Sequence, residues 1–175
     1  MQRKPIDIAQ LRLQPHDLFH NQWVLLTAGD FKAGEFNTMT IGWGALGTMW
    51  SKPFTFVAVR HSRYTYRFME NYNTFTLTAF PEQYQDALKL LGSRSGRDGD
   101  KIKDSGLTPQ ASLQVAAPSF KEAEIVIECQ KMYADDLNPA HFIDEEIYKH
   151  YPKRDFHRIY YGEILTAAGI DKYQA

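Results

Sequence analysis

Arginine, histidine and hydroxyl side chains are concentrated between Arg60 and Arg67, in the sequence Arg-His-Ser-Arg-Tyr-Thr-Tyr-Arg. Its three arginines stand out in a chain of 175 residues whose formal net charge is only -1. Guanidinium groups bind phosphate well, and so do the free N–H groups at the start of a helix. The segment therefore indicates an anion site. A solvated helix face is the alternative that composition alone leaves equally open.

A second basic and hydroxyl-rich segment runs from Ser93 to Lys101, in the sequence Ser-Arg-Ser-Gly-Arg-Asp-Gly-Asp-Lys. Taken alone, it has the composition of an ordinary polar loop.

A glycine pattern between Gly42 and Gly47 matches the G-x-G-x-x-G sequence of dinucleotide-binding proteins. That pattern has a physical meaning only where a crossover helix follows the third glycine. Five residues separate Gly47 from Pro53, and an apolar strand is expected from Phe54, so no such helix fits. We interpret the match as accidental, and the glycines as places where the backbone lies close to a flat or bulky group.

The elements that must position these residues are mostly strands, because apolar and β-branched residues alternate or run together over short segments. The strands are expected at residues 23–28, 36–41, 54–60, 74–80, 123–132 and 157–167. The first two form a hairpin, and the strand at 74–80 is expected to be half-buried, with Phe75, Leu77 and Ala79 inward. About six or seven mostly antiparallel strands predict a Greek-key barrel with helices at its rim.

Two helices are expected, one beginning at Ser62 as N-cap and ending near Asn71, the other running from Pro81 to a terminating Gly92. Residues 1–21 are expected to form an irregular arm. Residues 134–152 are expected to form a polar connection with a short helix from 142 to 148. Gly162, inside the last strand, predicts a bulge or a close approach.

Composition limits the classes of protein to which the chain can belong. Hydrophobic residues make up 43% and aromatic residues 14%, which suits one globular domain over residues 1–175. The near-zero net charge gives no reason to expect nucleic acid or an anionic membrane as partner. The single cysteine, Cys129, permits no internal disulfide, and no segment resembles a signal peptide or membrane helix. We expect a cytoplasmic protein without a metal site, since His141 and His150 lack the ligand spacing of zinc sites.

The ordered motifs resemble the flavin reductase-like, FMN-binding split-barrel family, and within it the flavoredoxin-type members. The resemblance covers about residues 20–168. The segments that carry it are 37–43, 50–53, 60–65, 92–98, 100–101, 127–129, 157 and 162–164. It implies a six-stranded antiparallel split barrel, a homodimer, and one FMN per protomer near the dimer interface.

The resemblance also implies roles for particular residues. The FMN phosphate and ribityl group would meet Arg60, Ser62, Arg63 and Thr65. The strand edge beside the isoalloxazine ring would be formed by Met39, Thr40, Ile41 and Gly42. The second loop that closes on the cofactor would contribute Ser93, Ser95 and Lys101. His157, which opens the last strand, is the candidate catalytic residue.

Elementary energetics agree with this assignment, because each charge-assisted hydrogen bond to a phosphate contributes about 1.5–3 kcal/mol. Other roles stay open for several of these residues. A structural histidine is favoured over a proton donor for His157, and packing or a dimer interface over flavin stacking for Trp43 and Trp50. Cys129 is expected to behave as a small hydrophobic residue.

The leading functional prediction is an oxidoreductase that transfers electrons from NAD(P)H or a redox protein through bound FMN. In one alternative the flavin is a substrate, released in reduced form to a separate monooxygenase. In another the chain is a non-catalytic FMN-binding electron carrier. The sequence contains no motif specific to a nicotinamide nucleotide.

Overall fold

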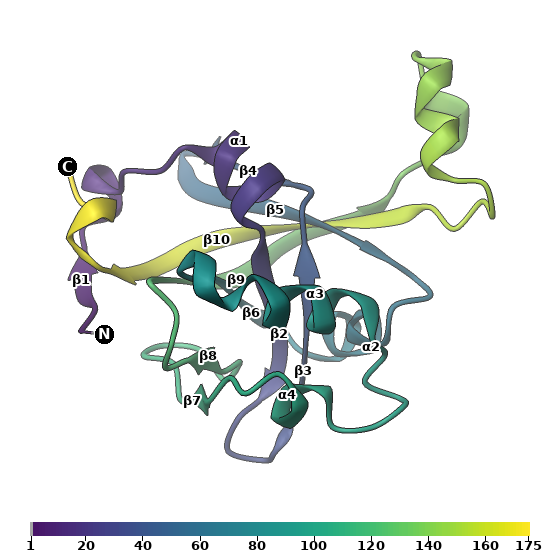
Figure 1. Cartoon of the computed structure of the whole chain (residues 1–175). Helices are drawn as coiled ribbons and strands as arrows, with labels where there is room; N and C mark the ends of the chain where they lie inside the picture. The colour runs from purple at the N-terminus through teal and green to yellow at the C-terminus, as the bar shows by residue number, and fades with distance from the viewer. Residues whose placement is uncertain (1) are drawn as a thin grey trace.

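A computed structural model describes residues 2–175, which are organised around one eight-stranded antiparallel sheet (Figure 1). The strands are β1 (Lys4–Ile6), β2 (Val24–Asp30), β3 (Glu35–Ile41), β4 (Gly44–Met49), β5 (Lys52–Arg60), β6 (Thr74–Ala79), β9 (Ile125–Asp136) and β10 (His157–Gly169). Their order is β3-β2-β6-β9-β10-β5-β4, with β1 paired to β10. Within residues 2–175 the end strands β3 and β4 do not pair with each other, which leaves the barrel split.

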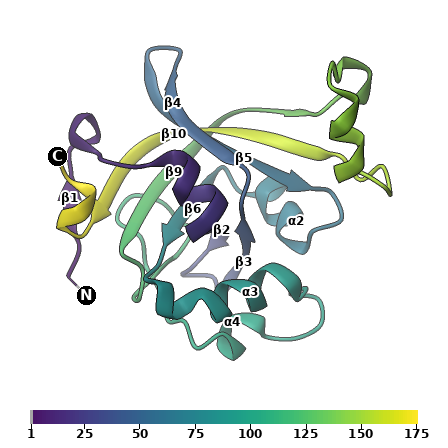
Figure 2. The same cartoon turned by 45° about the horizontal axis from the view of Figure 1, so that its top comes forward.

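Short helices surround this sheet (Figure 2): α2 packs Phe68 and Met69 into the barrel core, and α3 and α4 cover the opposite face of β2, where Leu25 lies. The α-helices are α1 (Pro15–Asp17), α2 (Tyr64–Asn71), α3 (Gln85–Ser93) and α4 (Lys101–Asp104). Short segments of other helix types are η1 (Ile8–Gln10), η2 (Leu18–Gln22), η3 (Glu82–Tyr84), η4 (Pro139–His141), η5 (Glu145–His150) and η6 (Asp171–Tyr173). A separate two-stranded ladder joins β7 (Pro109–Gln110) to β8 (Ser119–Phe120). The mainly-β split-barrel class is confirmed, with β1 and β4 as strands beyond the expected six.

The β2–β3 hairpin was predicted correctly, and its turn has a local cause. Asp30 Oδ1 accepts hydrogen bonds from the backbone N–H groups of Lys32 (2.8 Å) and Ala33 (3.2 Å). Gly34 closes the turn at φ +70°, a conformation that costs glycine little. The turn sets the register in which Leu26 lies opposite Met39.

Strand β6 is buried on both faces, so the expectation of a half-buried strand was wrong. Phe75, Leu77 and Ala79 enter the barrel core as predicted. Thr76 and Thr78, on the opposite face, are also fully buried, because the chain from β7 to β8 crosses that face. The hydroxyl of Thr76 donates to the Pro118 carbonyl at 2.7 Å.

Gly162 marks a bulge, as predicted. The register of β10 against β9 shifts between Tyr161 and Gly162. A Cβ atom at Gly162 would lie 2.5 Å from Cζ of Phe75 and 3.1 Å from Cβ of Cys129, so only glycine allows the two strands to pack here. Cys129 is fully buried in the core, as expected for a small hydrophobic residue.

Several local predictions were wrong at their boundaries. The glycine pattern is followed by no helix, but Gly44–Met49 forms β4 rather than a loop. The N-terminal arm is not irregular throughout, because Lys4–Ile6 pairs with β10. Helix α3 continues past Gly92 to Ser93, and η4 and η5 replace the single helix expected at 142–148. Strand β9 extends to Asp136, beyond its expected end at Met132.

Residues 137–156 project from the ends of β9 and β10 at one end of the sheet (Figure 1). This projecting segment carries η4 and η5 and returns to the sheet at His157. No helix among residues 2–175 has both the length and the apolar character needed to cross a membrane.

Candidate functional site

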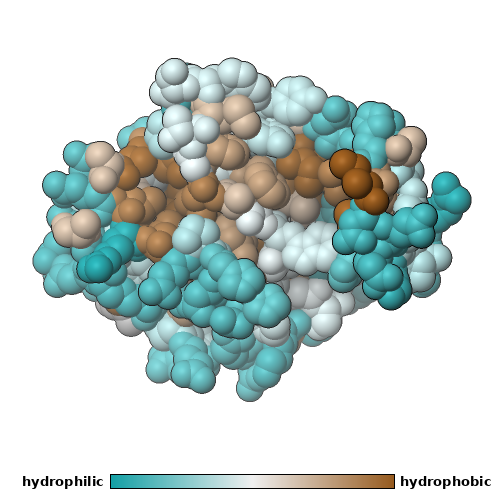
Figure 3. Space-filling view, turned by 90° about the horizontal axis from the view of Figure 1, so that it is seen from above, coloured by the Kyte–Doolittle hydropathy of each residue, from teal (hydrophilic) through white to brown (hydrophobic). Residues whose placement is uncertain are grey.

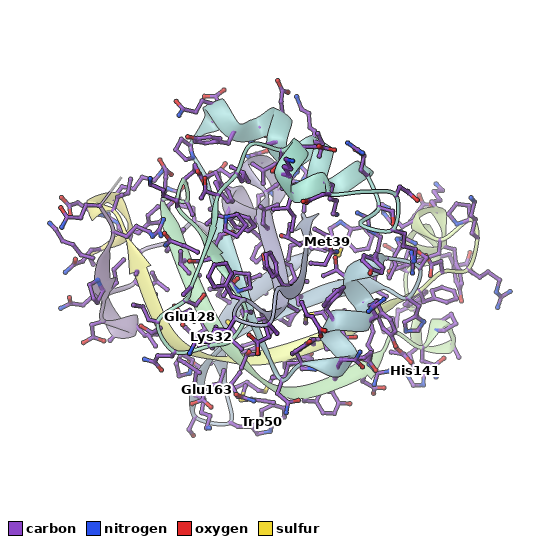
Figure 4. All side chains as sticks on the ribbon, turned by 90° about the horizontal axis from the view of Figure 1, so that it is seen from below. Lys32, Met39, Trp50, Glu128, His141 and Glu163 are labelled. Carbon is purple, nitrogen blue, oxygen red and sulfur yellow. The ribbon has the colours of Figure 1, made fainter. Side chains whose placement is uncertain are left out.

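A cleft of about 160 Å³ opens where the outer edge of β3 meets the start of α2 and the end of α3. Figure 4 shows Met39 on β3, between α2 and α3. The predicted site residues that line this cleft are Met39, Ser62, Arg63, Thr65, Ser93, Ser95 and Lys101. Tyr64, Arg94, Gly96 and Arg97 complete its wall. The fold therefore brings the two basic segments of the sequence to one site.

The lining of this phosphate-sized cleft is strongly cationic. It includes Arg63, Arg94, Arg97 and Lys101, and no aspartate or glutamate. Arg94 pairs with Asp104 at 2.7 Å, and Arg97 donates to the Ser62 carbonyl at 3.1 Å. Such a lining attracts an anion and repels a cation.

The start of α2 lacks the side-chain cap that the sequence predicted. Arg63, not Ser62, is the N-cap residue, and its side chain makes no capping hydrogen bond. Ser62 instead donates its hydroxyl to Asp155 Oδ2 at 2.5 Å. Within residues 2–175, the N–H groups of Tyr64 and Thr65 have no backbone acceptor. These donors and the positive end of the helix dipole therefore remain available to an anion.

The buried Lys101 and the partly buried Arg63 both lie at the C-terminal end of α3. Lys101 Nζ donates to the carbonyls of Leu91 (2.8 Å) and Arg94 (3.1 Å), and the Arg63 guanidinium donates to the Gly92 carbonyl. Lys101 is only 3% exposed and pairs with no carboxylate among residues 2–175. Burial, with a contribution from Arg63, lowers the pKa of Lys101 to about 8. Burial and Arg60 lower the pKa of Arg63. A bound phosphate would compensate both charges.

The other predicted residues of this strand edge, Thr40, Ile41 and Gly42, do not line the cleft. Thr40 Oγ1 donates to the Leu88 carbonyl at 2.5 Å beneath α3, and Ile41 belongs to the barrel core. What these residues can offer a ligand is backbone, because β3 pairs only with β2 in the described sheet. An unpaired strand edge presents alternating N–H and C=O groups.

Arg60 is also directed elsewhere, despite its closeness to Arg63 in the sequence. Its guanidinium donates to the carbonyls of Asp155 (2.8 Å) and His150 (2.9 Å). It also lies 4.9 Å from the ring centroid of Tyr151. Arg60 therefore attaches the projecting segment to the end of β5.

His157 lies beside this attachment, paired with Arg60 across the β5–β10 ladder and 8% exposed. Its Nδ1 is 2.8 Å from the Tyr151 hydroxyl, and its ring centroid is 4.7 Å from that of Trp43. Burial, with Arg60 and then His61 adding and Asp155 opposing, lowers the pKa of His157 to about 4. The imidazole is therefore neutral at pH 7.

A larger apolar cavity of about 820 Å³ adjoins this histidine. Its walls include Phe19, Trp43, Phe56, Phe142 and Tyr151. Figure 3 shows hydrophobic side chains gathered on the face that carries α1, β4 and the projecting segment. Apart from the exposed Trp43, no sequence signal indicated this cavity, because its walls come from segments separated by about a hundred residues.

The edge of β3 and the turn after it connect the two sites. Met39 lines the cationic cleft, and Gly42, three residues later, lines the apolar cavity. An elongated ligand with an anionic end and a flat apolar end could span this distance along the strand edge.

Comparison with known proteins gives a family match over most of the chain. Residues 17–172 match the family described as the flavin reductase like domain. An uncharacterized protein of Pyrococcus abyssi is 31% identical over 97 residues, which is 55% of this chain and 54% of that protein. An uncharacterized protein of Archaeoglobus fulgidus is 33% identical over 96 residues, 54% of this chain and 52% of that protein. The matched part thus spans about half the length of these curated relatives.

Solved structures share the fold at low sequence identity. An FMN-binding domain of a flavin reductases-like enzyme from Shewanella baltica has a TM-score of 0.70 at 16% identity, covering 96% of this chain and 77% of that chain. Flavoredoxin of Desulfovibrio vulgaris has a TM-score of 0.68 at 21% identity, covering 89% and 73%. The NADH:FAD oxidoreductase SgcE6 of Streptomyces globisporus has a TM-score of 0.63 at 17% identity, covering 83% and 73%.

Proposed function

The chain belongs to the flavin reductase-like domain family, and from this premise we propose that it is an FMN-binding oxidoreductase. Electrons would enter from NAD(P)H or a redox protein and leave through the bound flavin. The observation that carries the proposal is the acid-free cationic cleft joined by the edge of β3 to an apolar cavity. Its two ends match the two ends of FMN, a phosphate of charge near -2 and a flat ring.

The phosphate end would be held by the uncapped first turn of α2 together with Arg63 and Lys101. A buried lysine without a carboxylate partner is costly in the cofactor-free protein, and a phosphate supplies the missing negative charge. The cleft of about 160 Å³ accommodates the phosphate and part of the ribityl chain, not the whole cofactor. Ser95 and Thr65 add hydroxyl groups at this end.

The ring end would lie along residues 39–42, where the free edge of β3 supplies backbone donors and acceptors. FMN, when bound, supplies the redox chemistry, because the isoalloxazine ring accepts and donates electrons. This chain's residues bind and orient the ring and exclude water from it. The apolar cavity beside Trp43 is the proposed place for the electron donor or acceptor.

We also propose that residues 1–175 form one domain and that two copies associate in a cytoplasmic homodimer. Membership of the family supports the proposed homodimer. Trp43 and Trp50 support it as well, because their side chains are 43% and 59% exposed. Large exposed aromatic side chains are typical of interfaces.

The test of the proposal is an FMN titration of the purified protein, followed by anaerobic mixing with NADH or NADPH. We expect FMN to bind more tightly than riboflavin, because only FMN carries the phosphate, and we expect its visible absorbance to bleach on reduction. Absence of FMN binding would overturn the proposal. Gel filtration separates a retained cofactor from a released substrate, and binding without reduction by nicotinamide nucleotides would favour an electron carrier.

A further inference from the structure

The contact between Tyr151 and His157 constrains the position of a proton. The residue Tyr151 is buried, and within residues 2–175 its hydroxyl makes only one hydrogen bond, to Nδ1 of His157 at 2.8 Å. Burial raises the pKa of Tyr151, so the phenol stays protonated at neutral pH. A buried hydroxyl proton needs an acceptor, and the one acceptor among the described residues that lies within hydrogen-bond distance is Nδ1 of His157.

The tautomer of the ring follows from this constraint. A neutral imidazole that accepts at Nδ1 carries its proton on Nε2. His157 Nε2 has no hydrogen-bond partner among the described residues, so its N–H remains available to a ligand. The reverse tautomer would leave the Tyr151 hydroxyl without an acceptor among residues 2–175.

The projecting segment is held so that this contact persists. Arg60 donates to the carbonyls of His150 and Asp155, on both sides of Tyr151, and its guanidinium lies over the Tyr151 ring. Trp43 packs against both rings, at 6.3 Å from Tyr151 and 4.7 Å from His157 between centroids.

We propose that Tyr151, fixed by Arg60, is the positioning residue that holds His157 as a neutral N–H donor. His157 then offers Nε2–H to a carbonyl oxygen of the flavin or of the second substrate, and it does not act as a titrating acid. This inference rests on the proposed function for the identity of that acceptor. The tautomer itself depends only on residues of this chain.

The groups that face His157 agree with a neutral ring. Arg60 on β5 disfavours a second proton, Asp155 on the projecting segment favours it more weakly than Arg60 opposes it, and His61 adds a smaller unfavourable effect. His150 contacts Trp43 at 5.4 Å between centroids, on the cavity side. Activity that depends on His157 is therefore expected to stay level between about pH 5 and 8.

The test uses Tyr151→Phe, with Tyr148→Phe as the matched control. Tyr148 is on the same segment, but its hydroxyl donates to the Pro139 carbonyl at 2.8 Å and does not contact His157. Long-range proton–nitrogen NMR of the nitrogen-15-labelled protein reports the tautomer and titration of His157 without any cofactor. We expect the Nε2–H tautomer in the unmodified protein and in Tyr148→Phe. In Tyr151→Phe we expect a mixture of tautomers and a higher pKa, because the hydroxyl that stabilises the neutral form is lost.

Kinetics of flavin reduction provide the second measurement. Tyr151→Phe is expected to lower the reduction rate about three- to ten-fold and to shift the onset of any pH dependence upward from the His157 pKa of about 4. Tyr148→Phe should leave the rate unchanged. His157→Gln keeps an N–H donor at a similar reach and is expected to retain more activity than His157→Ala.

An Nδ1–H tautomer in the unmodified protein would overturn the inference, even if Tyr151→Phe failed to fold. An unchanged tautomer and pH profile in a folded Tyr151→Phe protein would overturn it as well. If the tautomer is as expected but no flavin binds, the proposed function fails while the positioning of His157 stands.

Discussion

Lys101→Met offers a sharp test of the phosphate cleft, because it removes a buried charge while keeping most of the side-chain volume. Lys101 Nζ is held by the carbonyls of Leu91 and Arg94 at 2.8 and 3.1 Å and lines the cleft. Losing one charge-assisted hydrogen bond to the phosphate costs about 1.5–3 kcal/mol. FMN should therefore bind roughly ten- to a hundred-fold more weakly, and riboflavin nearly as before.

The lowered pKa of Lys101 predicts that both the stability of the protein and its affinity for FMN depend on pH. Without cofactor its pKa is lowered from 10.5 to about 8, mainly by burial, so the protonated form in the folded protein is disfavoured by about 3 kcal/mol. The folded pKa lies below the unfolded value, so the cofactor-free protein gains stability as pH rises through this interval. A bound phosphate raises the pKa again. FMN binding should therefore take up a proton above pH 8 and weaken by up to about ten-fold per pH unit there.

The assay is quenching of flavin fluorescence, with FMN and riboflavin titrated in parallel at several pH values. Lys103→Met is the matched control, because Lys103 lies on the same short helix but is exposed and does not line the cleft. Lys101→Met should abolish the pH dependence of FMN affinity above pH 8, and Lys103→Met should preserve it. Equal weakening of FMN and riboflavin, or an equal effect of the control, would refute the phosphate assignment.

Three further predictions follow from the same geometry. Arg63→Ala should weaken FMN roughly ten- to a hundred-fold more than riboflavin, whereas Arg60→Ala, whose side chain contacts the projecting segment, should affect both ligands alike in the same titration. His157→Ala should keep FMN bound and lower the anaerobic reduction rate about ten- to a hundred-fold; an unchanged rate would leave His157 structural. Gly162→Ala should lower the free energy of unfolding by about 1–3 kcal/mol in denaturant titrations, since its Cβ would lie 2.5 Å from the Phe75 ring; unchanged stability would show that the bulge relaxes easily.

The strands could be predicted because their signal is local. Alternation or a run of apolar residues marks Val24–Asp30, Lys52–Arg60 and His157–Gly169 in the sequence, and each segment is a strand. Gly162 was identified as a bulge for the same reason, since an isolated glycine inside a strand pattern has few other uses. Strand β4 was missed because its glycines weaken the β-propensity of a short segment.

The grouping of the site residues could be predicted in part from the sequence. The family resemblance implied that Ser93, Ser95 and Lys101 close on the same cofactor as the arginine segment, and the structure brings Arg63, Ser95 and Lys101 to one cleft. Ser62 was a wrong choice of N-cap, because Asp155 accepts its hydroxyl proton and lies 93 positions later in the chain. A hydrogen-bond acceptor so distant in the sequence cannot be predicted from the residues around the start of the helix.

By itself the sequence determined the strand-rich class, because that class rests on residue types and short spacings, and its ordered motifs carried the resemblance to the family. It also predicted an anion site at residues 60–67, to which the resemblance added the segment 93–101. Only the tertiary structure decided that Arg63 faces the cleft while Arg60 turns to Tyr151, three residues apart on the chain. The same is true of the apolar cavity and of the neutral state of His157. Side-chain direction, burial and the choice of hydrogen-bond partner depend on contacts across about a hundred residues, and these exist only once the sheet has formed.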